Sequence, residues 1–189
     1  MGRWKPDARG RIAKAALELY GKRGFEQTTV AEIAKRAGVT ERTFFRHFAD
    51  KREVLFGGSA RLQELLVNTV ANAPHSDEPI EAVAAALQAS TTYLNDREYS
   101  RRRQVILAAN DELRERELIK LATLGAAIAA ALRRRGVKEP AASLTAEAGI
   151  AVFRVAFERW VDPSNTKELP QLMRESLAEL KGLVGPPAR

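Results

Sequence analysis

The stretch from Thr28 to Lys51 constrains this chain most, because two short helical patterns flank a tight turn in it. Apolar residues recur at the i, i+3, i+4 and i+7 spacing of one helix face: Val30, Ile33, Ala34 and Ala37. Gly38 ends this pattern, and glycine tolerates the positive φ of a sharp turn. Thr40 can cap a second helix, in which Phe44 and Phe48 lie four residues apart and face the core. We therefore expect two short helices that share a small core.

The second helix has the size of a DNA-reading element. A helix of about nine residues is roughly 13 Å long at about 1.5 Å per residue. That length suits the DNA major groove, which is about 12 Å wide. The pattern predicts a helix-turn-helix with residues 40–48 as the recognition helix.

Residues 10–56 resemble the N-terminal domain of the tetracycline-repressor-like (TetR) family of transcriptional regulators. The matching pieces are Gly24-Phe25, Thr28-Thr29-Val30, Ile33-Ala34, Ala37-Gly38-Val39, Thr43-Phe44-Phe45-Arg46-His47-Phe48, and Lys51 with Glu53-Val54-Leu55. The family usually has a tyrosine where Phe45 stands, and that hydroxyl commonly meets a DNA phosphate. Phe45 keeps only contacts to a sugar or a thymine methyl group. The resemblance also implies phosphate contacts from His47 and Lys51.

These patterns give a set of predicted DNA contacts: Thr29, Thr40, Glu41, Arg42, Thr43, Phe45, Arg46, His47 and Lys51. Arg42 can pair with guanine, with a phosphate contact as the alternative. Glu41 can accept from cytosine or only favour the helix dipole. Thr29 is explained equally well by a capping box with Glu32, and His47 also fits an ordinary surface histidine.

Charge and composition agree with a DNA-binding front end. Of the net charge of +7, residues 1–58 carry +6, from 13 Lys and Arg against 7 Asp and Glu. This count includes Arg3, Lys5, Arg9 and Arg11, which are candidates for phosphate contacts, with a solvated tail as the alternative. The chain has no cysteine and two histidines, so we expect no metal site and no cofactor. It lacks a run of about 18 apolar residues and an apolar signal sequence, which predicts a cytoplasmic protein without membrane contact.

We predict an all-α fold of about nine helices in two domains. Residues 1–56 would form the three-helix DNA-binding domain, and residues 57–189 a larger helical domain for ligand binding and dimerisation. One helix is predicted from Asp50 or Lys51 to about Asn72. Within it, the pair Gly57-Gly58 indicates either a kink or close packing against a neighbouring helix. After a break at residues 73–79, the next helix would begin with Ser76 or Asp77 as its cap and run to about Asn95.

Residues 143–161 are apolar on nearly all sides, so a helix there must bury two faces. One stripe runs through Leu144, Ala148, Val152, Val155 and Ala156. We predict that the other pairs with the helix over residues 168–184 in a four-helix interface between two chains, with a larger monomeric core as the alternative. The predicted interface residues are Ile150, Phe153, Phe157, Trp160, Leu172, Met173, Leu177 and Leu180.

The family resemblance implies a small-molecule pocket in the second domain, whose filling changes the separation of two recognition helices. Small apolar residues there suit an apolar or amphipathic effector. Candidate lining residues, which also fit ordinary core positions, are Tyr93, Leu107, Asn110 and Phe153. The expected function is a dimeric repressor released from a pseudo-palindromic operator by this ligand. The alternative is a ligand-independent DNA-binding protein or activator, and no motif favours an enzyme.

Overall fold

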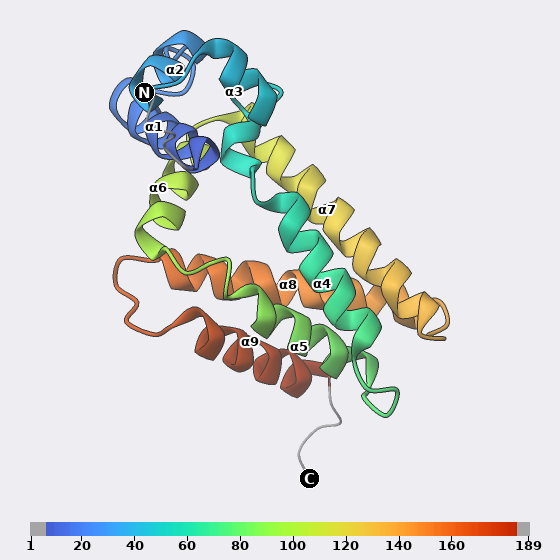
Figure 1. Cartoon of the computed structure of the whole chain (residues 1–189). Helices are drawn as coiled ribbons and strands as arrows, with labels where there is room; N and C mark the ends of the chain where they lie inside the picture. Colours follow the sequence, from blue (N-terminus) through green and yellow to red (C-terminus); the bar gives the residue numbers. More distant parts are fainter. Residues whose placement is uncertain (1–6, 185–189) are drawn as a thin grey trace. The chain divides into compact units, whose positions relative to one another are not determined.

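The computed structural model describes residues 7–184 (Figure 1). Within them the chain forms nine α-helices and one short 3-10 helix and no strand, which confirms the all-α prediction. The elements are α1 (Ala8–Arg23), α2 (Val30–Ala37), α3 (Glu41–His47), η1 (Glu53–Phe56), α4 (Ser59–Asn72), α5 (Pro79–Ser90), α6 (Arg97–Ala108), α7 (Asp111–Arg134), α8 (Ala141–Val161) and α9 (Leu169–Val184). Arg3 and Lys5 lie outside the described residues.

The chain divides into two compact units. The first comprises the residues up to Gly57 together with Arg101–Glu117, and the second comprises Gly58–Ser100 and the residues from Leu118 onward. The predicted domains, residues 1–56 and 57–189, place the first boundary one residue away. They do not anticipate that residues 101–117, from α6 and α7, belong to the first unit.

The first unit is built around α1, α2 and α3, which pack against one another. Ile12, Ile33 and Phe44 are completely buried between them. Gly38 ends α2 at φ 66°, as the turn requires, and its backbone N–H bonds the carbonyls of Ala34 and Lys35. The predicted helix-turn-helix is therefore present, and its turn depends on the left-handed glycine.

A continuous helix from residue 50 or 51 to Asn72 is wrong. The chain instead forms η1, turns at Gly57 and Gly58, and then begins α4. A Cβ atom added at Gly57 would lie 2.9 Å from Cε1 of Phe48, whereas one added at Gly58 would meet nothing within 4 Å. Close packing, the alternative to a kink, therefore describes Gly57, because its missing side chain makes room for the Phe48 ring.

Arginines from residues 101–117 bind η1 within the first unit. Arg103 donates from Nε to the Leu55 carbonyl at 2.7 Å and lies over the Phe56 ring, 5.1 Å from its centroid. Arg116 pairs with Glu53, and Arg103 pairs with Glu117 at 2.9 Å. These contacts explain why residues 101–117 belong to the first unit. The spacing of residues in the sequence does not predict them.

The second unit is a helical core in which α5 contacts α4, α8 and α9 (Figure 1). Gly149 lets α8 approach α5, because a Cβ atom there would lie 2.4 Å from Cγ1 of Val83. Arg135 binds the carbonyls of Val70, Ala73 and Pro74, so its guanidinium holds the C-terminal end of α4.

The helix α5 differs from its prediction at both ends. Neither Ser76 nor Asp77 is its N-cap; that position is Glu78, without a side-chain cap, and Pro79 is the first helical residue. The helix ends at Ser90 and not near Asn95, because the chain continues as turns through Thr91 and Thr92.

The predicted dimer interface is wrong for most of its residues. Six are buried in the core of their own chain: Ile150, Phe153, Phe157, Trp160, Leu172 and Met173. Leu177 and Leu180 pack against that core and are partly buried. Of the other stripe, Leu144 is 66% exposed and Val155 is 43% exposed, whereas Val152 and Ala156 are buried. The aromatic stripe faces inward because it buries more apolar area than the stripe of smaller residues.

Candidate nucleic-acid interface

The recognition helix α3 presents a short, well-anchored surface. Thr40 accepts from the Thr43 backbone N–H at 3.1 Å, and the two hydroxyl oxygens lie 3.0 Å apart. Phe44 is completely buried beneath the helix. The exposed residues of α3 are Glu41, Arg42, Phe45 and Arg46. The first unit therefore offers DNA one acidic, one aromatic and two basic side chains from this helix.

Three of the seven cations on α1 and α2, Lys22, Arg23 and Arg36, form ion pairs. Glu18 accepts from Lys22 at 2.8 Å and from Arg36 at 2.7 Å, which joins the two helices. Glu32 pairs with Arg23 at 2.6 Å. Hydrogen bonds from Lys22 and then Arg36 lower the pKa of Glu18. Both carboxylates are therefore charged near neutral pH and offset the cations beside them.

Two further arginines of α1 are structural. Arg9 lies over the Phe48 ring, 4.9 Å from its centroid, and donates to the Gly57 carbonyl. Arg11 donates to the Ala37 carbonyl at 2.8 Å, at the end of α2. Sequence reasoning missed both roles, because nothing in the spacing of these residues distinguishes a structural arginine from one that binds phosphate.

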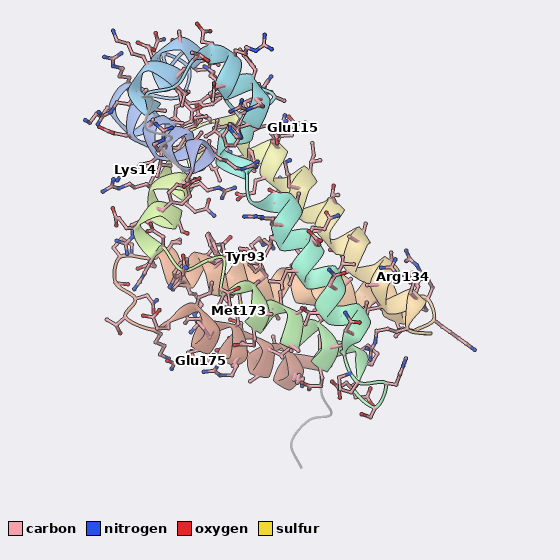
Figure 2. All side chains as sticks on the ribbon, viewed as in Figure 1. Lys14, Tyr93, Glu115, Arg134, Met173 and Glu175 are labelled. Carbon is pink, nitrogen blue, oxygen red and sulfur yellow. The ribbon has the colours of Figure 1, made fainter. Side chains whose placement is uncertain are left out.

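Four cations on α1–α3 stay exposed and make no ion pair or hydrogen bond with the described part of the chain: Lys14, Lys35, Arg42 and Arg46. Lys14 lies on α1 (Figure 2) and Lys35 on α2. Two of these four cations, Arg42 and Arg46, share the short α3, which also exposes the acidic Glu41.

Lys51 has a different environment from the one predicted. Its ammonium group donates to three carbonyls, those of Phe25 at 3.0 Å, Glu26 at 3.1 Å and Thr28 at 3.1 Å. It also lies 4.5 Å from the centroid of the Phe25 ring. An ammonium group has three N–H donors. Lys51 therefore stabilises the connection between α1 and α2. Its surroundings do not support the predicted phosphate contact.

Two other predicted DNA contacts, Thr29 and His47, differ in their hydrogen bonding. Thr29 caps α2 in a complete capping box: its hydroxyl accepts from the Glu32 N–H at 3.2 Å, and its own N–H donates to Glu32 at 3.0 Å. Hydrogen bonds to the Glu32 carboxylate, first from the Thr29 backbone N–H and then from its hydroxyl, lower the pKa of Glu32. His47 is half-buried, and its Nε2 atom is buried without a partner in the described residues. Capping therefore accounts for Thr29 without DNA.

The four predicted pocket residues are divided between the two units. Leu107 and Asn110 belong to the first unit, where the Asn110 amide donates to the Ile106 carbonyl at 2.6 Å. Tyr93 and Phe153 belong to the second, where Tyr93 is 53% exposed and Phe153 is part of the core. The pocket predicted from these four residues stays a prediction.

A partly open cavity of about 550 Å³ lies in the second unit, between α5 and the first half of α9. Its apolar lining includes Ala85, Leu87, Met173 and Leu177, and Asp77 and Arg174 add charge. Met173 lies on α9 (Figure 2). A lining that is part apolar and part charged suits an amphipathic molecule.

Residues 7–184 hold no group of three or more metal-binding side chains. None of the helices in this range is both long and apolar enough to span a membrane.

Two family models match the chain. One, described as bacterial regulatory proteins of the tetR family, matches residues 12–56. The other, described as the MftR C-terminal domain, matches residues 77–184, which is more than half of the chain.

Relatives and solved structures agree with these models. The chain is 36% identical over 90 residues to the HTH-type transcriptional regulator TcmR of Streptomyces glaucescens, covering 48% of this chain and 40% of TcmR. It is 34% identical over 97 residues to a putative mycofactocin biosynthesis transcriptional regulator, MftR, of Mycobacterium tuberculosis, covering 49% and 47%. The alignments thus span less than half of these two relatives. Among solved structures, the TetR family transcriptional repressor FadR of Thermus thermophilus, in complex with lauroyl-CoA, matches with 27% identity and a TM-score of 0.56, covering 96% of this chain and 98% of FadR.

Proposed function

Since this chain belongs to the tetR family of bacterial regulatory proteins, we propose that it is a dimeric, sequence-specific DNA-binding transcriptional regulator. In this proposal the chain is a repressor that a small apolar or amphipathic ligand releases from a pseudo-palindromic operator. The related proteins named above are regulators, which favours a role without catalysis. The observation that carries the proposal is the exposed face of α3, where Arg42 and Arg46 have no partner within the described residues.

In this proposal Arg42 reads a base. It lies in the first turn of α3, and arginine pairs bidentately with O6 and N7 of guanine. The operator is obtained by selecting bound duplexes from a random pool. We expect Arg42→Ala to weaken operator binding by about 1–3 kcal/mol and to relax preference at one base position. Lys35→Ala is the matched control, because Lys35 is also exposed and unpaired but lies on α2.

Two results would contradict this assignment. Equal losses on operator and random DNA for Arg42→Ala would show that Arg42 contacts only phosphate. Failure of the unmodified protein to retain any duplex from the random pool at low ionic strength would refute the DNA-binding proposal itself.

The dimer would use the exposed stripe of α8. Its members, spaced by four, three and four residues, are Leu144, Ala148, Ala151 and Val155. This near-heptad spacing suits packing against a second helix. Glu147 and Arg154 are both exposed, lie seven residues apart beside the stripe, and are without partners in the described residues. In a two-fold interface, each contact between a residue of one chain and a residue of the other occurs a second time with the chains exchanged. Glu147 of each chain can therefore pair with Arg154 of the other.

A dimer gives the DNA reading its specificity, because two recognition helices read half-sites about 34–36 Å apart or at a related spacing. The single chain has a mass of 20.9 kDa. We expect sedimentation at micromolar protein to give twice this mass, and Leu144→Glu with Val155→Glu to give the single mass with its helix content unchanged. A monomeric unmodified protein would contradict the proposal.

The effector would bind in the cavity between α5 and α9. The FadR structure holds lauroyl-CoA, an amphipathic molecule, which makes lauroyl-CoA and free laurate suitable probes. We expect at least one of them to raise the melting temperature and to weaken operator binding. Ala85→Trp should remove both effects, because Ala85 is exposed and lines the cavity. Ala122→Trp on α7 is the control, since Ala122 is also exposed but does not line this cavity.

The mechanism is thermodynamic linkage. A ligand weakens DNA binding only by its difference in affinity for the two states, typically about 1–3 kcal/mol. Ligand binding that leaves operator affinity unchanged would favour the alternative, a ligand-independent regulator.

A further inference from the structure

We propose that Phe45 reads the methyl group of a thymine in the operator. The inference rests on the proposed DNA-binding function and adds a second specificity determinant to it. Phe45 is 53% exposed, although Phe44 on the same helix and Phe48 at its C-cap are buried. Core packing therefore does not explain an aromatic ring at this position. Its direct neighbours on the exposed surface, Arg42 and Arg46, are charged.

The ring is held in place before any DNA arrives. It meets the completely buried Phe44 edge to face, with centroids 5.4 Å apart and an angle of 81° between the planes. Aromatic pairs favour this geometry. An anchored ring loses little side-chain entropy on binding, so an apolar contact made by Phe45 is realised nearly in full.

The chemistry of the ring selects its partner. Phenylalanine has no polar atom and can form no hydrogen bond to a phosphate or to a base edge. In the major groove the C5-methyl group of thymine is the apolar feature that distinguishes one base from the others. A ring that contacts this methyl group therefore carries sequence information, which a sugar contact does not.

The position of the thymine follows from the helix. Phe45 lies three residues after Arg42, and side chains at this spacing are neighbours with Cβ atoms about 5–6 Å apart. Base pairs follow each other at about 3.4 Å. The thymine should therefore lie within about two base pairs of the guanine that Arg42 reads.

Replacing thymine by deoxyuridine removes only the methyl group, which makes it a direct test. The probe is the duplex selected from the random pool, with one thymine at a time replaced by deoxyuridine in one half-site. For the unmodified protein we expect one position in this window to raise the Kd about fourfold, the effect of losing one buried methyl group. Replacements elsewhere should leave the Kd unchanged.

Variants assign the effect to the ring. Phe45→Ala should bind the parent duplex more weakly and should bind the thymine and deoxyuridine duplexes equally. Phe45→Leu retains an apolar side chain and should retain a smaller difference. Arg46→Ala, the control on the same helix, should weaken binding to both duplexes alike. Circular dichroism checks that each variant keeps its helix content.

The inference fails separately from the proposed function. If the unmodified protein selects an operator but no thymine in the window responds to deoxyuridine, Phe45 does not read a methyl group. An operator without thymine in the window, or a Phe45→Ala variant that keeps the fourfold difference, overturns it as well. If no duplex is selected at all, the proposed function has failed.

Discussion

Replacing Lys51 by alanine separates a structural role from DNA binding. The change removes three hydrogen bonds from the ammonium group to the carbonyls of Phe25, Glu26 and Thr28, and a contact with the Phe25 ring. A hydrogen bond to a charged group contributes about 1.5–3 kcal/mol, and an exposed cation–π contact about 0.5–1 kcal/mol. Bonds that share one ammonium group do not add fully. We therefore expect a loss of about 2–4 kcal/mol in the free energy of unfolding.

The assay measures melting temperature and DNA binding on the same full-length variants. For a chain of this size about 1 kcal/mol corresponds to 2–4 °C, so Lys51→Ala should melt about 5–15 °C lower. The slope of log Kd against log salt should stay unchanged, because no phosphate contact is lost. Lys35→Ala is the control and should melt within about 2 °C of the unmodified protein. A Lys51→Ala variant of normal stability whose salt slope falls by about 1 would refute this reasoning.

Three further predictions concern the interface, the ion pairs and the turn. Glu147→Arg and Arg154→Glu should each weaken the dimer in sedimentation, and the double variant should restore it; a double variant weaker than either single one would exclude the pairing. Glu18→Gln should lower the melting temperature at pH 7, and this difference should vanish as the pH falls through the lowered pKa of Glu18. The sign follows because the pKa of Glu18 is lowered on folding, so its stabilisation is present above the unfolded pKa and is lost through the folded pKa; a difference that persists at pH 2.5 would argue against the charge. Gly57→Ala should cost about 1–3 kcal/mol because its Cβ meets a ring carbon at 2.9 Å. Gly58→Ala should be neutral or stabilise by up to about 1 kcal/mol in a urea titration, and equal effects at both glycines would count against the packing argument.

Local signals allowed the helix-turn-helix to be predicted from sequence. Gly38, Thr40 and the buried Phe44 act through the residues next to them, so their spacing is enough to identify a turn, a cap and a core position. The same holds for the capping box of Thr29 and Glu32.

Contacts between distant segments could not be predicted in this way. The spacing of α8 shows two apolar stripes and does not say which one faces the core. The sequence therefore predicts that Phe153 contacts a second chain, whereas in the structure it packs in the core of its own chain. The family resemblance implies a phosphate contact for Lys51, and the spacing of the sequence could not reveal its carbonyl partners, which lie 23–26 residues away. The break between η1 and α4 depends on the Phe48 ring, nine residues before Gly57, and a propensity scale does not contain that contact.

The pairing of Glu18 and Glu32 with cations on α1 and α2 bears on how the protein searches a genome. Affinity for random DNA grows with the number of phosphates neutralised, and carboxylates that already hold arginines reduce that number. A protein with few unpaired basic side chains binds unrelated sequences for only a small part of the time. This holds even though such sequences outnumber the operator by about a million to one or more. A small number of copies in a cell could then keep a single promoter occupied.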